Sequence, residues 1–390
     1  MGKLEELVQV YCPQGVKYIL LETVCQISKG VQFNKSAMND IGTYPVINGG
    51  IAASGYIEQY NQEENTITIS QGGASAGYVN WNKTKFWAGA HCYVLKPTDR
   101  VLNRYLFHFV KSKEQKLQEC QYGAGIPALA KSTVASLQIP LPPLAVQQEI
   151  VRILDSFTEL TAELTAELTA RRKQYEHYRD ELLDNPLGSS MMTLGEIADY
   201  RRGSFPQPYG NAEWYGGDSA MPFVQVADVE EYGMVLREKT KQQISVIAQP
   251  KSVFVPTGTV ICSIQGSIGR VAITQYDSYV DRTLAIFEKY KINIDKRFFA
   301  YQIQRKFGIE KEFARGSTLK TITKEEFTKF KIPVPPLNEQ KRIVSILDRF
   351  DILCNDLTSG LPAEIAAQQK QYEYYRDKLL TFKELEVQSD

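Results

Sequence analysis

The sequence predicts an α+β protein made of two tandem mixed domains, each followed by a long helix, with internal pseudo-two-fold symmetry. The main observation is a long repeat. Residues 139–157 and 332–350 agree at 12 of 19 positions at an offset of 193. Residues 173–183 and 370–380 agree at nine of 11 positions at an offset of 197. Repeats of this length indicate a duplicated domain-plus-helix unit, and 390 residues leave room for more than one core.

Each domain has a mixed pattern of short strands and one or two helices. Two segments with helical spacing, 103–116 and 296–307, lie in matching places of the two copies. The edges of the copies align but their middles differ, and the second carries about 19 extra residues. A compact α+β domain fits this pattern. β-branched and apolar runs predict strands at 65–70, 90–95, 252–255, 259–262 and 283–287.

Long helices are predicted after each domain. Pro142-Pro143 and Pro335-Pro336 end the domains, because proline cannot continue a strand or helix ladder. Residues 146–183 contain no Pro or Gly and predict one helix of 38 residues, about 57 Å long. Its apolar stripe needs a partner, and the natural partner is its own copy at 338–380, which Gly360 and Pro362 should interrupt. The expected pairing residues are Ile150, Leu154, Phe157, Leu160, Leu164, Leu168, Tyr175, Tyr178, Ile343, Leu347, Phe350, Tyr372 and Tyr375.

The first helix also contains repeated Thr-Ala-Glu-Leu units between residues 158 and 170. The second copy has no such repeat, and its segment between the two matches is four residues longer. The units give at least a stripe of leucines for helix pairing. They are also consistent with a ruler, because each unit adds about 6 Å of helix, comparable to one or two base-pair steps.

Composition and charge exclude several classes of protein. No apolar run is long enough to span a bilayer, and six scattered cysteines indicate reduced thiols in a cytoplasmic protein. Only three histidines and no CxxC pair leave little for a metal site. Net charge is zero, but residues 1–140 and 185–333 carry +3 and +4, whereas 141–184 and 334–390 carry −4 and −3. Basic blocks that face phosphates and acidic ones that face protein would explain this alternation, although ordinary fluctuation would too.

The motifs resemble one family closely. The strings IPLPPL at 139–144 and IPVPPL at 332–337 are each followed by an I-V-x-I-L-D-x-F helix and by K-Q-Y-E-x-Y-R-D-x-L-L. With the Thr-Ala-Glu-Leu units, this pattern strongly resembles the specificity subunit of type I restriction–modification systems, in the group that carries such spacer repeats. The resemblance implies target recognition domains at 1–143 and 185–336, a central spacer helix at 144–184 and a C-terminal helical region at 337–390, with the helices paired as an antiparallel coiled coil.

The resemblance also implies partners and chemistry. Each domain would read one half of a bipartite, asymmetric target in double-stranded DNA. Two copies of a methyltransferase subunit would methylate adenine N6 with S-adenosylmethionine, and restriction subunits would cleave DNA with ATP and Mg²⁺. This chain would hold no cofactor, no metal and no catalytic residue, and it would not contact a membrane. The residues agree, since no Asn-Pro-Pro-Tyr motif or GxxxxGK[ST] loop is present.

Candidate DNA contacts are polar and basic residues near strand ends. Arg and Lys can read guanine, and Asn and Gln can read adenine. The candidates are Gln71, Ser75, Tyr78, Asn80, Lys83, Lys85, Arg201, Arg202, Gln225, Gln265, Ser267, Arg270 and Arg282. In each case a solvated hairpin or loop explains the residue equally well, and Arg201 and Arg202 would also serve as phosphate contacts.

Two other classes of protein stay open at this point. A self-sufficient enzyme, such as a fused methyltransferase, is disfavoured by the missing cofactor and catalytic motifs. A two-headed coiled-coil scaffold that binds proteins rather than DNA is disfavoured by the divergent, basic interiors of the two domains.

Overall fold

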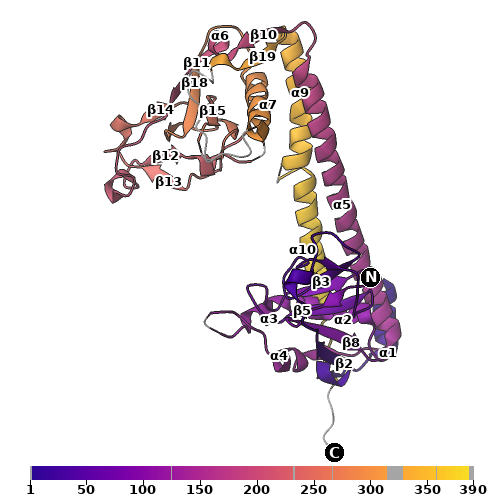
Figure 1. Cartoon of the computed structure of the whole chain (residues 1–390). Helices are drawn as coiled ribbons and strands as arrows, with labels where there is room; N and C mark the ends of the chain where they lie inside the picture. Colours follow the sequence, from indigo (N-terminus) through magenta and orange to yellow (C-terminus); the bar gives the residue numbers. More distant parts are fainter. Residues whose placement is uncertain are drawn as a thin grey trace, which may run out of the picture. The chain divides into compact units, whose positions relative to one another are not determined.

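The computed structural model describes residues 2–123, 125–231, 233–265, 267–313, 328–356 and 358–385 (Figure 1). The chain forms two compact units. The first comprises Met1–Glu163 and Ala366–Asp390, and the second comprises Leu164–Ile365. Each unit therefore contains one mixed domain together with helical segments from both copies of the repeat. Among the described residues, no helix has the length and apolar character needed to cross a membrane.

The long helical segments are α5 (Leu144–Asp184), α9 (Leu337–Asn355) and α10 (Leu361–Leu379). Helix α5 runs unbroken for 41 residues, slightly beyond the predicted range. The second copy is divided between α9 and α10, around the glycine that sequence reasoning identified. A Cβ atom at Gly360 would lie 2.4 Å from the carbonyl oxygen of Ile352, so only glycine fits there. Asp356 accepts hydrogen bonds from the backbone and side chain of Thr358, which holds the turn between the helices.

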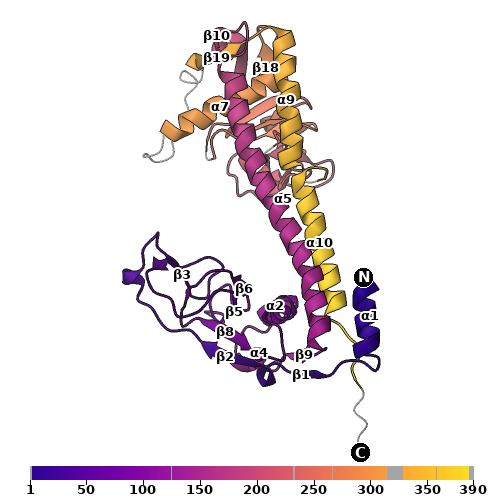
Figure 2. The ribbon, with the colours of Figure 1, turned by 90° about the vertical axis from the view of Figure 1, so that its right-hand side faces the viewer.

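The first domain contains two sheets and short helices (Figure 2). An antiparallel sheet has the order β2-β8-β5-β6, and a smaller sheet has the order β4-β3-β7, in which β3 and β7 run parallel. A separate antiparallel pair, β1 and β9, closes the domain. The elements are α1 (Gly2–Tyr11), β1 (Tyr18–Leu20), β2 (Cys25–Lys29), β3 (Tyr44–Ile47), β4 (Tyr56–Ile57), β5 (Thr66–Ser70), β6 (Val79–Asn82), β7 (Trp87–Ala88), β8 (Cys92–Pro97), α2 (Asn103–Ser112), α3 (Glu114–Glu119), α4 (Lys131–Ala135) and β9 (Gln138–Pro140).

The second domain repeats this plan with additions. It contains two four-stranded sheets. One has the order β11-β18-β15-β16, and the other has the order β13-β12-β17-β14, in which β12 and β17 run parallel. Strands β13 and β14 lie within the region where the sequence predicted extra residues. The elements are β10 (Ser190–Thr193), α6 (Leu194–Ile197), β11 (Ala198–Arg202), β12 (Met221–Val224), β13 (Gln242–Ile244), β14 (Val253–Val255), β15 (Val260–Ser263), β16 (Val271–Ile273), β17 (Ser278–Val280), β18 (Leu284–Tyr290), α7 (Lys296–Phe313) and β19 (Lys331–Val334).

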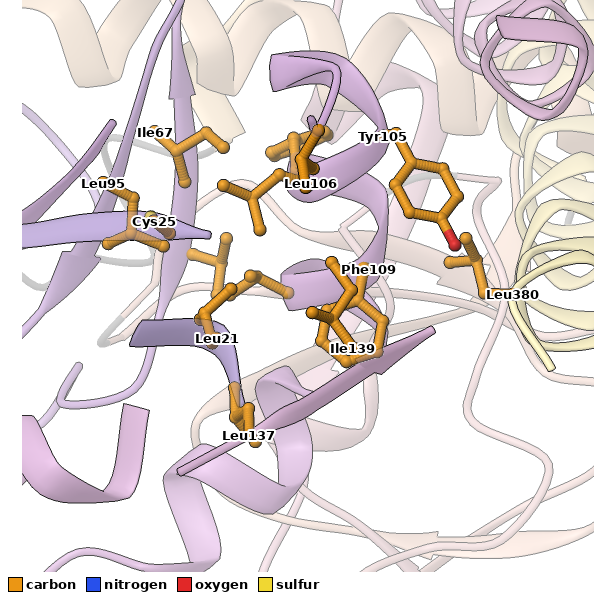
Figure 3. Packing of buried hydrophobic residues seen from close by; sticks show 14 of the residues in the cluster. Leu21, Cys25, Ile67, Leu95, Tyr105, Leu106, Phe109, Leu137, Ile139 and Leu380 are labelled. Carbon is orange, nitrogen blue, oxygen red and sulfur yellow. The ribbon is translucent and has the colours of Figure 1, made fainter. Parts of the chain in front are cut away.

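The core of the first unit joins segments from both ends of the chain. Ile150 and Leu154 of α5 pack in one apolar cluster with Tyr372 of α10 and with Leu380, which follows α10. Figure 3 shows Leu380 beside Tyr105 of α2 in this cluster. Burying these side chains favours the packing of α10 on the domain.

The second unit has the same arrangement with the copies exchanged. Ile343 and Leu347 of α9 are fully buried in a cluster that includes Leu183 of α5, with Tyr175 packed against it. Tyr175 and Tyr372 occupy the same place in the repeated K-Q-Y-E motif. In each unit the motif from one copy thus packs on the domain of the other copy, which explains physically why the motif occurs twice.

Candidate nucleic-acid interface

Each domain is fastened to the helix that follows it by a repeated polar clamp. In the first unit, Arg104 Nε lies 2.7 Å and His108 Nε2 lies 2.8 Å from Asp155 Oδ1 of α5. The matching clamp of the second unit joins Arg297 (2.5 Å) and the Tyr301 hydroxyl (2.7 Å) to Asp348 of α9. Charge-assisted hydrogen bonds of this kind fix geometry as well as adding stability. The clamp holds each domain in a defined position on its own helix.

A buried glutamine in each copy completes this attachment. The amide of Gln147 accepts a hydrogen bond from the Leu102 backbone and donates to the carbonyl of Pro142. Gln340 does the same with Asp295 and Pro335, at 2.8 Å for both bonds. Both side chains are almost fully buried, so their loss would leave unpaired backbone groups.

Protonation differs between the two clamps because His108 stands where the second unit has Tyr301. Burial lowers the pKa of His108, which keeps the imidazole neutral near pH 7. Burial alone would raise the pKa of Asp155, but hydrogen bonds from His108 and Arg104 outweigh it and lower the pKa. Burial raises the pKa of Tyr301, so that phenol stays protonated and donates to Asp348. The first clamp can therefore gain a proton on His108 only at a pH below the ordinary histidine value of 6.5.

In both domains, the same set of backbone hydrogen bonds, which we call the frame, joins strand ends of the two sheets to the loops beside them. Six bonds recur at matching positions and join the strand ends to the adjoining loops. In the first domain they are Gly30 N to Cys92 O (3.1 Å), Val31 N to Ala88 O (2.8 Å), Gly89 N to Ile47 O (2.8 Å), Cys92 N to Gly89 O (3.3 Å), Ser70 N to Tyr78 O (2.9 Å) and Gly77 N to Ser70 O (2.8 Å). In the second they are Gly203 N to Leu284 O (3.1 Å), Ser204 N to Val280 O (3.0 Å), Asp281 N to Val224 O (3.0 Å), Leu284 N to Asp281 O (3.0 Å), Ser263 N to Arg270 O (2.8 Å) and Gly269 N to Ser263 O (3.0 Å).

Gly30 and Gly203, which directly follow β2 and β11, lie against neighbouring backbone where only glycine fits. A Cβ atom on Gly30 would lie 2.2 Å from the carbonyl oxygen of Gly89, and one on Gly203 would lie 2.1 Å from that of Val280. Backbone approaches backbone too closely for any side chain. The shared frame therefore explains why both copies carry glycine here.

The side chains on this frame differ between the domains. We call this part of each domain its loop edge: Lys29, Asn48, Gln71 and residues 89–91 in the first domain, and Arg202, Gln225, Gln265 and residues 281–283 in the second. A shared backbone with different polar side chains suits two surfaces that recognise different patterns of donors and acceptors.

In the first domain, the loop edge is held by amide groups. Asn48 Oδ1 accepts a hydrogen bond from the backbone of His91 at 3.2 Å. The Gln71 amide donates to the carbonyl of Ala90 at 3.3 Å and accepts from Lys29 Nζ at 3.2 Å when its nitrogen faces Ala90. The side chains of Lys29 and His91 are exposed on this edge.

In the second domain, the loop edge surrounds an open pocket of about 480 Å³. Gln225, Gln265 and Arg282 line it. The Arg282 guanidinium lies 5.2 Å from the ring centre of Tyr209, whose hydroxyl donates to Asp281 at 2.6 Å. Burial and this hydrogen bond to Asp281 raise the pKa of Tyr209, so the donor persists at neutral pH.

Comparison with known protein families agrees with this architecture. The family model for the type I restriction modification DNA specificity domain matches residues 13–171 and 186–367. This chain belongs to that family.

Relatives support the assignment. A putative type I restriction enzyme specificity subunit of Haemophilus influenzae is 32% identical over 364 residues, covering 89% of this chain and 90% of the relative. The EcoR124I/EcoR124II specificity subunit of Escherichia coli is 37% identical over 305 residues, covering 75% of this chain and 74% of that protein. As a member of the family, the chain is a non-catalytic specificity subunit.

Solved structures share the fold. The S subunit of a type I restriction–modification system from M. genitalium gives a TM-score of 0.58 at 18% identity, covering 94% of this chain and 96% of that one. A chain from a study of complex assembly and conformational transition in a type I system gives 0.62 at 19% identity, covering 95% and 98%. These structures confirm the α+β plan with two tandem domains and a long helix.

The specificity-subunit fold places the candidate contacts of the first domain in two separate groups. Gln71 and Ser75 lie in the turn that precedes β6, whereas Lys83 and Lys85 follow its far end. Lys85 is engaged with Glu63 at 3.0 Å and with the Tyr60 hydroxyl at 3.1 Å. The structure thus does not bring the two lysines to the loop edge, because β6 separates them from it.

Tyr78 and Asn80 also make contacts within the domain. Lys111 Nζ lies 4.6 Å from the ring centre of Tyr78, and Asn80 donates to Asn82 Oδ1 at 3.0 Å. Both residues are half-buried.

In the second domain, three candidates share the pocket and the others lie outside it. Gln225, Gln265 and Arg282 come together, with Ser267 exposed just beyond Gln265. Arg270 lies elsewhere: its guanidinium donates to the carbonyl of Val229 at 3.1 Å and lines a different pocket, of about 340 Å³, with Tyr175.

Arg201 and Arg202 both lie on β11, an edge strand of the β11-β18-β15-β16 sheet. Arg201 is paired with Glu288 at 2.6 Å, and both arginine side chains are exposed. Arg202, at the end of the strand, belongs to the loop edge.

The expected helix-pairing residues divide between two environments. Ring contacts join helices within each unit: Phe157 stacks on Tyr375 at 5.3 Å, and Phe350 lies 6.2 Å from Tyr175 and 6.0 Å from Tyr178. Four aliphatic residues instead lie in the domain cores: Ile150, Leu154, Ile343 and Leu347. Along the spacer, Leu164 and Leu168 are half-buried, whereas Leu160 is 39% exposed.

Sequence reasoning missed several residues of the loop edges. Lys29, Asn48, His91 and Tyr209 belong to or brace these edges but were not among the candidates. The repeat itself contained a usable signal, because an offset of 192 places Ala90 and His91 opposite Arg282 and Thr283.

Proposed function

We propose that this specificity subunit directs a cytoplasmic type I restriction–modification complex to a bipartite, asymmetric target in double-stranded DNA, with each domain reading one part. The observation that carries the proposal is the loop edge, where one backbone frame presents Lys29, Gln71 and His91 in one domain and Gln225, Gln265 and Arg282 in the other. Exposed cations and amides are the groups that contact phosphates and base edges.

The chemistry belongs to partner subunits in this proposal. Two methyltransferase subunits transfer a methyl group from S-adenosylmethionine to adenine N6, and restriction subunits use ATP and Mg²⁺ to cleave unmodified DNA. The specificity chain binds none of these cofactors. Its role is to fix which adenines face the methyltransferase subunits.

The repeated units of α5 act as a ruler in the same proposal. The Thr-Ala-Glu-Leu segment lies within an unbroken helix, and its leucines at 164 and 168 are half-buried. Adding a unit lengthens the helix by about 6 Å without altering either domain. The number of units would then set the unspecified spacer between the two half-sites.

A reconstituted methylation assay tests the proposed function. The purified chain alone should transfer no methyl groups to DNA. With its methyltransferase partner it should methylate adenine only in DNA that contains both half-sites, and scrambling either half should abolish transfer. Methylation independent of sequence, or a partner complex that ignores DNA, would favour the protein-binding scaffold instead.

A further inference from the structure

We propose that the tip of the loop edge, residues 89–91 in the first domain and 281–283 in the second, carries the specificity-determining residues. Arg282 reads a guanine in one half-site, and His91 reads a base in the other. This inference rests on the proposed function and assigns it to two side chains.

Arg282 is presented in a fixed position. Its guanidinium lies over the ring of Tyr209, and the loop that carries it is braced from both sides by Asp281. The Asp281 carboxylate accepts from the Tyr209 hydroxyl at 2.6 Å and from the backbone and hydroxyl of Thr283 at 2.9 and 2.6 Å. Asp281 is 3% exposed, so water competes little for these bonds. A braced, exposed guanidinium loses little conformational freedom on binding.

The surroundings favour base reading over phosphate contact. Arg282 shares the 480 Å³ pocket with the side chains of Gln225 and Gln265. A guanidinium matches guanine O6 and N7 as a bidentate donor, and a glutamine amide matches adenine N6 and N7. A phosphate contact needs only a cation, whereas this pocket combines a planar fork with two amides. Its donors and acceptors therefore suit the edges of neighbouring base pairs.

The first domain presents different chemistry on the same frame. Ala90 takes the place of Arg282, so no long side chain projects there. His91 follows, its backbone held by Asn48, with Lys29 and Gln71 beside it. An imidazole can donate or accept one hydrogen bond at a base edge, unlike the bidentate guanidinium. The tips should therefore specify different bases.

The test maps N6-methyladenine across genomic DNA modified by the chain and its methyltransferase partner. Three variants are compared with the wild type: Arg282→Ala, Arg282→Lys and His91→Ala. Lys296→Ala and Lys96→Ala are matched controls, because these lysines lie at the opposite ends of β15 and β8 from the tips. Lys296 Nζ donates to the Gly258 carbonyl just before β15, and Lys96 is exposed near the end of β8. Circular dichroism melting checks that every variant is folded.

The expected result is local to one half-site in each case. Arg282→Ala should reduce the preference for guanine at one position of one half-site by about 10- to 100-fold, and Arg282→Lys should retain part of it. His91→Ala should relax one position of the other half-site, and both controls should keep the wild-type motif. A folded Arg282→Ala variant with an unchanged motif would overturn the proposal. If the wild type itself shows no bipartite motif, the proposed function fails instead.

Discussion

Single residues explain how two domains that differ in sequence keep one frame. Gly30 and Gly203 allow backbone to approach backbone where any side chain would collide. Asp155 and Asp348 each accept hydrogen bonds from an arginine and from a second side chain of the domain that they hold. These positions were visible in the repeat as matching letters, but their roles were not, because they depend on contacts between segments distant in sequence.

Replacing Gly203 with alanine should destabilise the second domain by about 1–3 kcal/mol, because the added Cβ would overlap the Val280 carbonyl. Urea unfolding followed by circular dichroism measures the change. Gly210→Ala is the control, since nothing lies within 4 Å of a Cβ there. Equal stabilities for the two variants would show that the close approach is not a real constraint.

The buried His108 should make the first unit sensitive to acid. Its pKa in the folded state lies below the ordinary value of 6.5, so the unfolded chain binds more protons as pH falls. This contribution to stability is fully present above about pH 6.5 and is lost as the pH falls below it. His108→Gln, which does not titrate, should unfold with a smaller change in midpoint between pH 7.5 and 5.5. If the midpoint of the His108→Gln variant changes between these two pH values as much as that of the wild type, groups other than His108 cause the acid sensitivity.

Secondary-structure elements were largely predictable, whereas their pairing was not. The predicted strands at 65–70 and 259–262 correspond to β5 and β15, and the predicted helix at 296–307 lies within α7. Periodicity and β-branched runs are local signals, so they survive in one sequence. The parallel pairing of β3 with β7 brings Asn48 close to His91. No local sequence pattern predicts this pairing. This is why Asn48 and His91 were not found from the sequence, although Gln71 of the same loop edge was.

The docking of α10 on the first domain gives a prediction at the scale of elements. Leu380→Ala should cost the first unit about 2–5 kcal/mol, because Leu380 is buried in the core beside Tyr105. Hydrogen exchange of β5 and β8 should accelerate accordingly. Leu385→Ala, at a residue 38% exposed, should leave exchange nearly unchanged. Unaltered protection in the Leu380 variant would mean that α10 contributes little to this core.

At the scale of the whole molecule, each structural unit contains segments from both copies of the repeat, so one copy does not correspond to one unit. The first unit takes Tyr372 from the second copy, and the second unit takes Tyr175 from the first. One continuous helix, α5, supplies residues to both. The sequence predicted the duplication and the helix, but the exchange of motifs emerged only from the packing.

Inserting one Thr-Ala-Glu-Leu unit after Leu168 should lengthen the unspecified spacer of the DNA target by about one or two base pairs, since the helix gains about 6 Å. Both half-sites should keep their sequences, because neither loop edge changes. A methylation map of the insertion variant measures both the spacer length and the sequences of the two half-sites. An unchanged spacer would remove the ruler and leave DNA recognition in place.

The most direct measurement is the genome-wide map of N6-methyladenine produced by the wild-type chain with its methyltransferase partner. The two loop edges share a backbone arrangement but carry different side chains. We therefore predict a methylated motif with two different half-sites separated by a gap of fixed length. A single contiguous motif, two identical halves, or methylation without sequence preference would contradict the account.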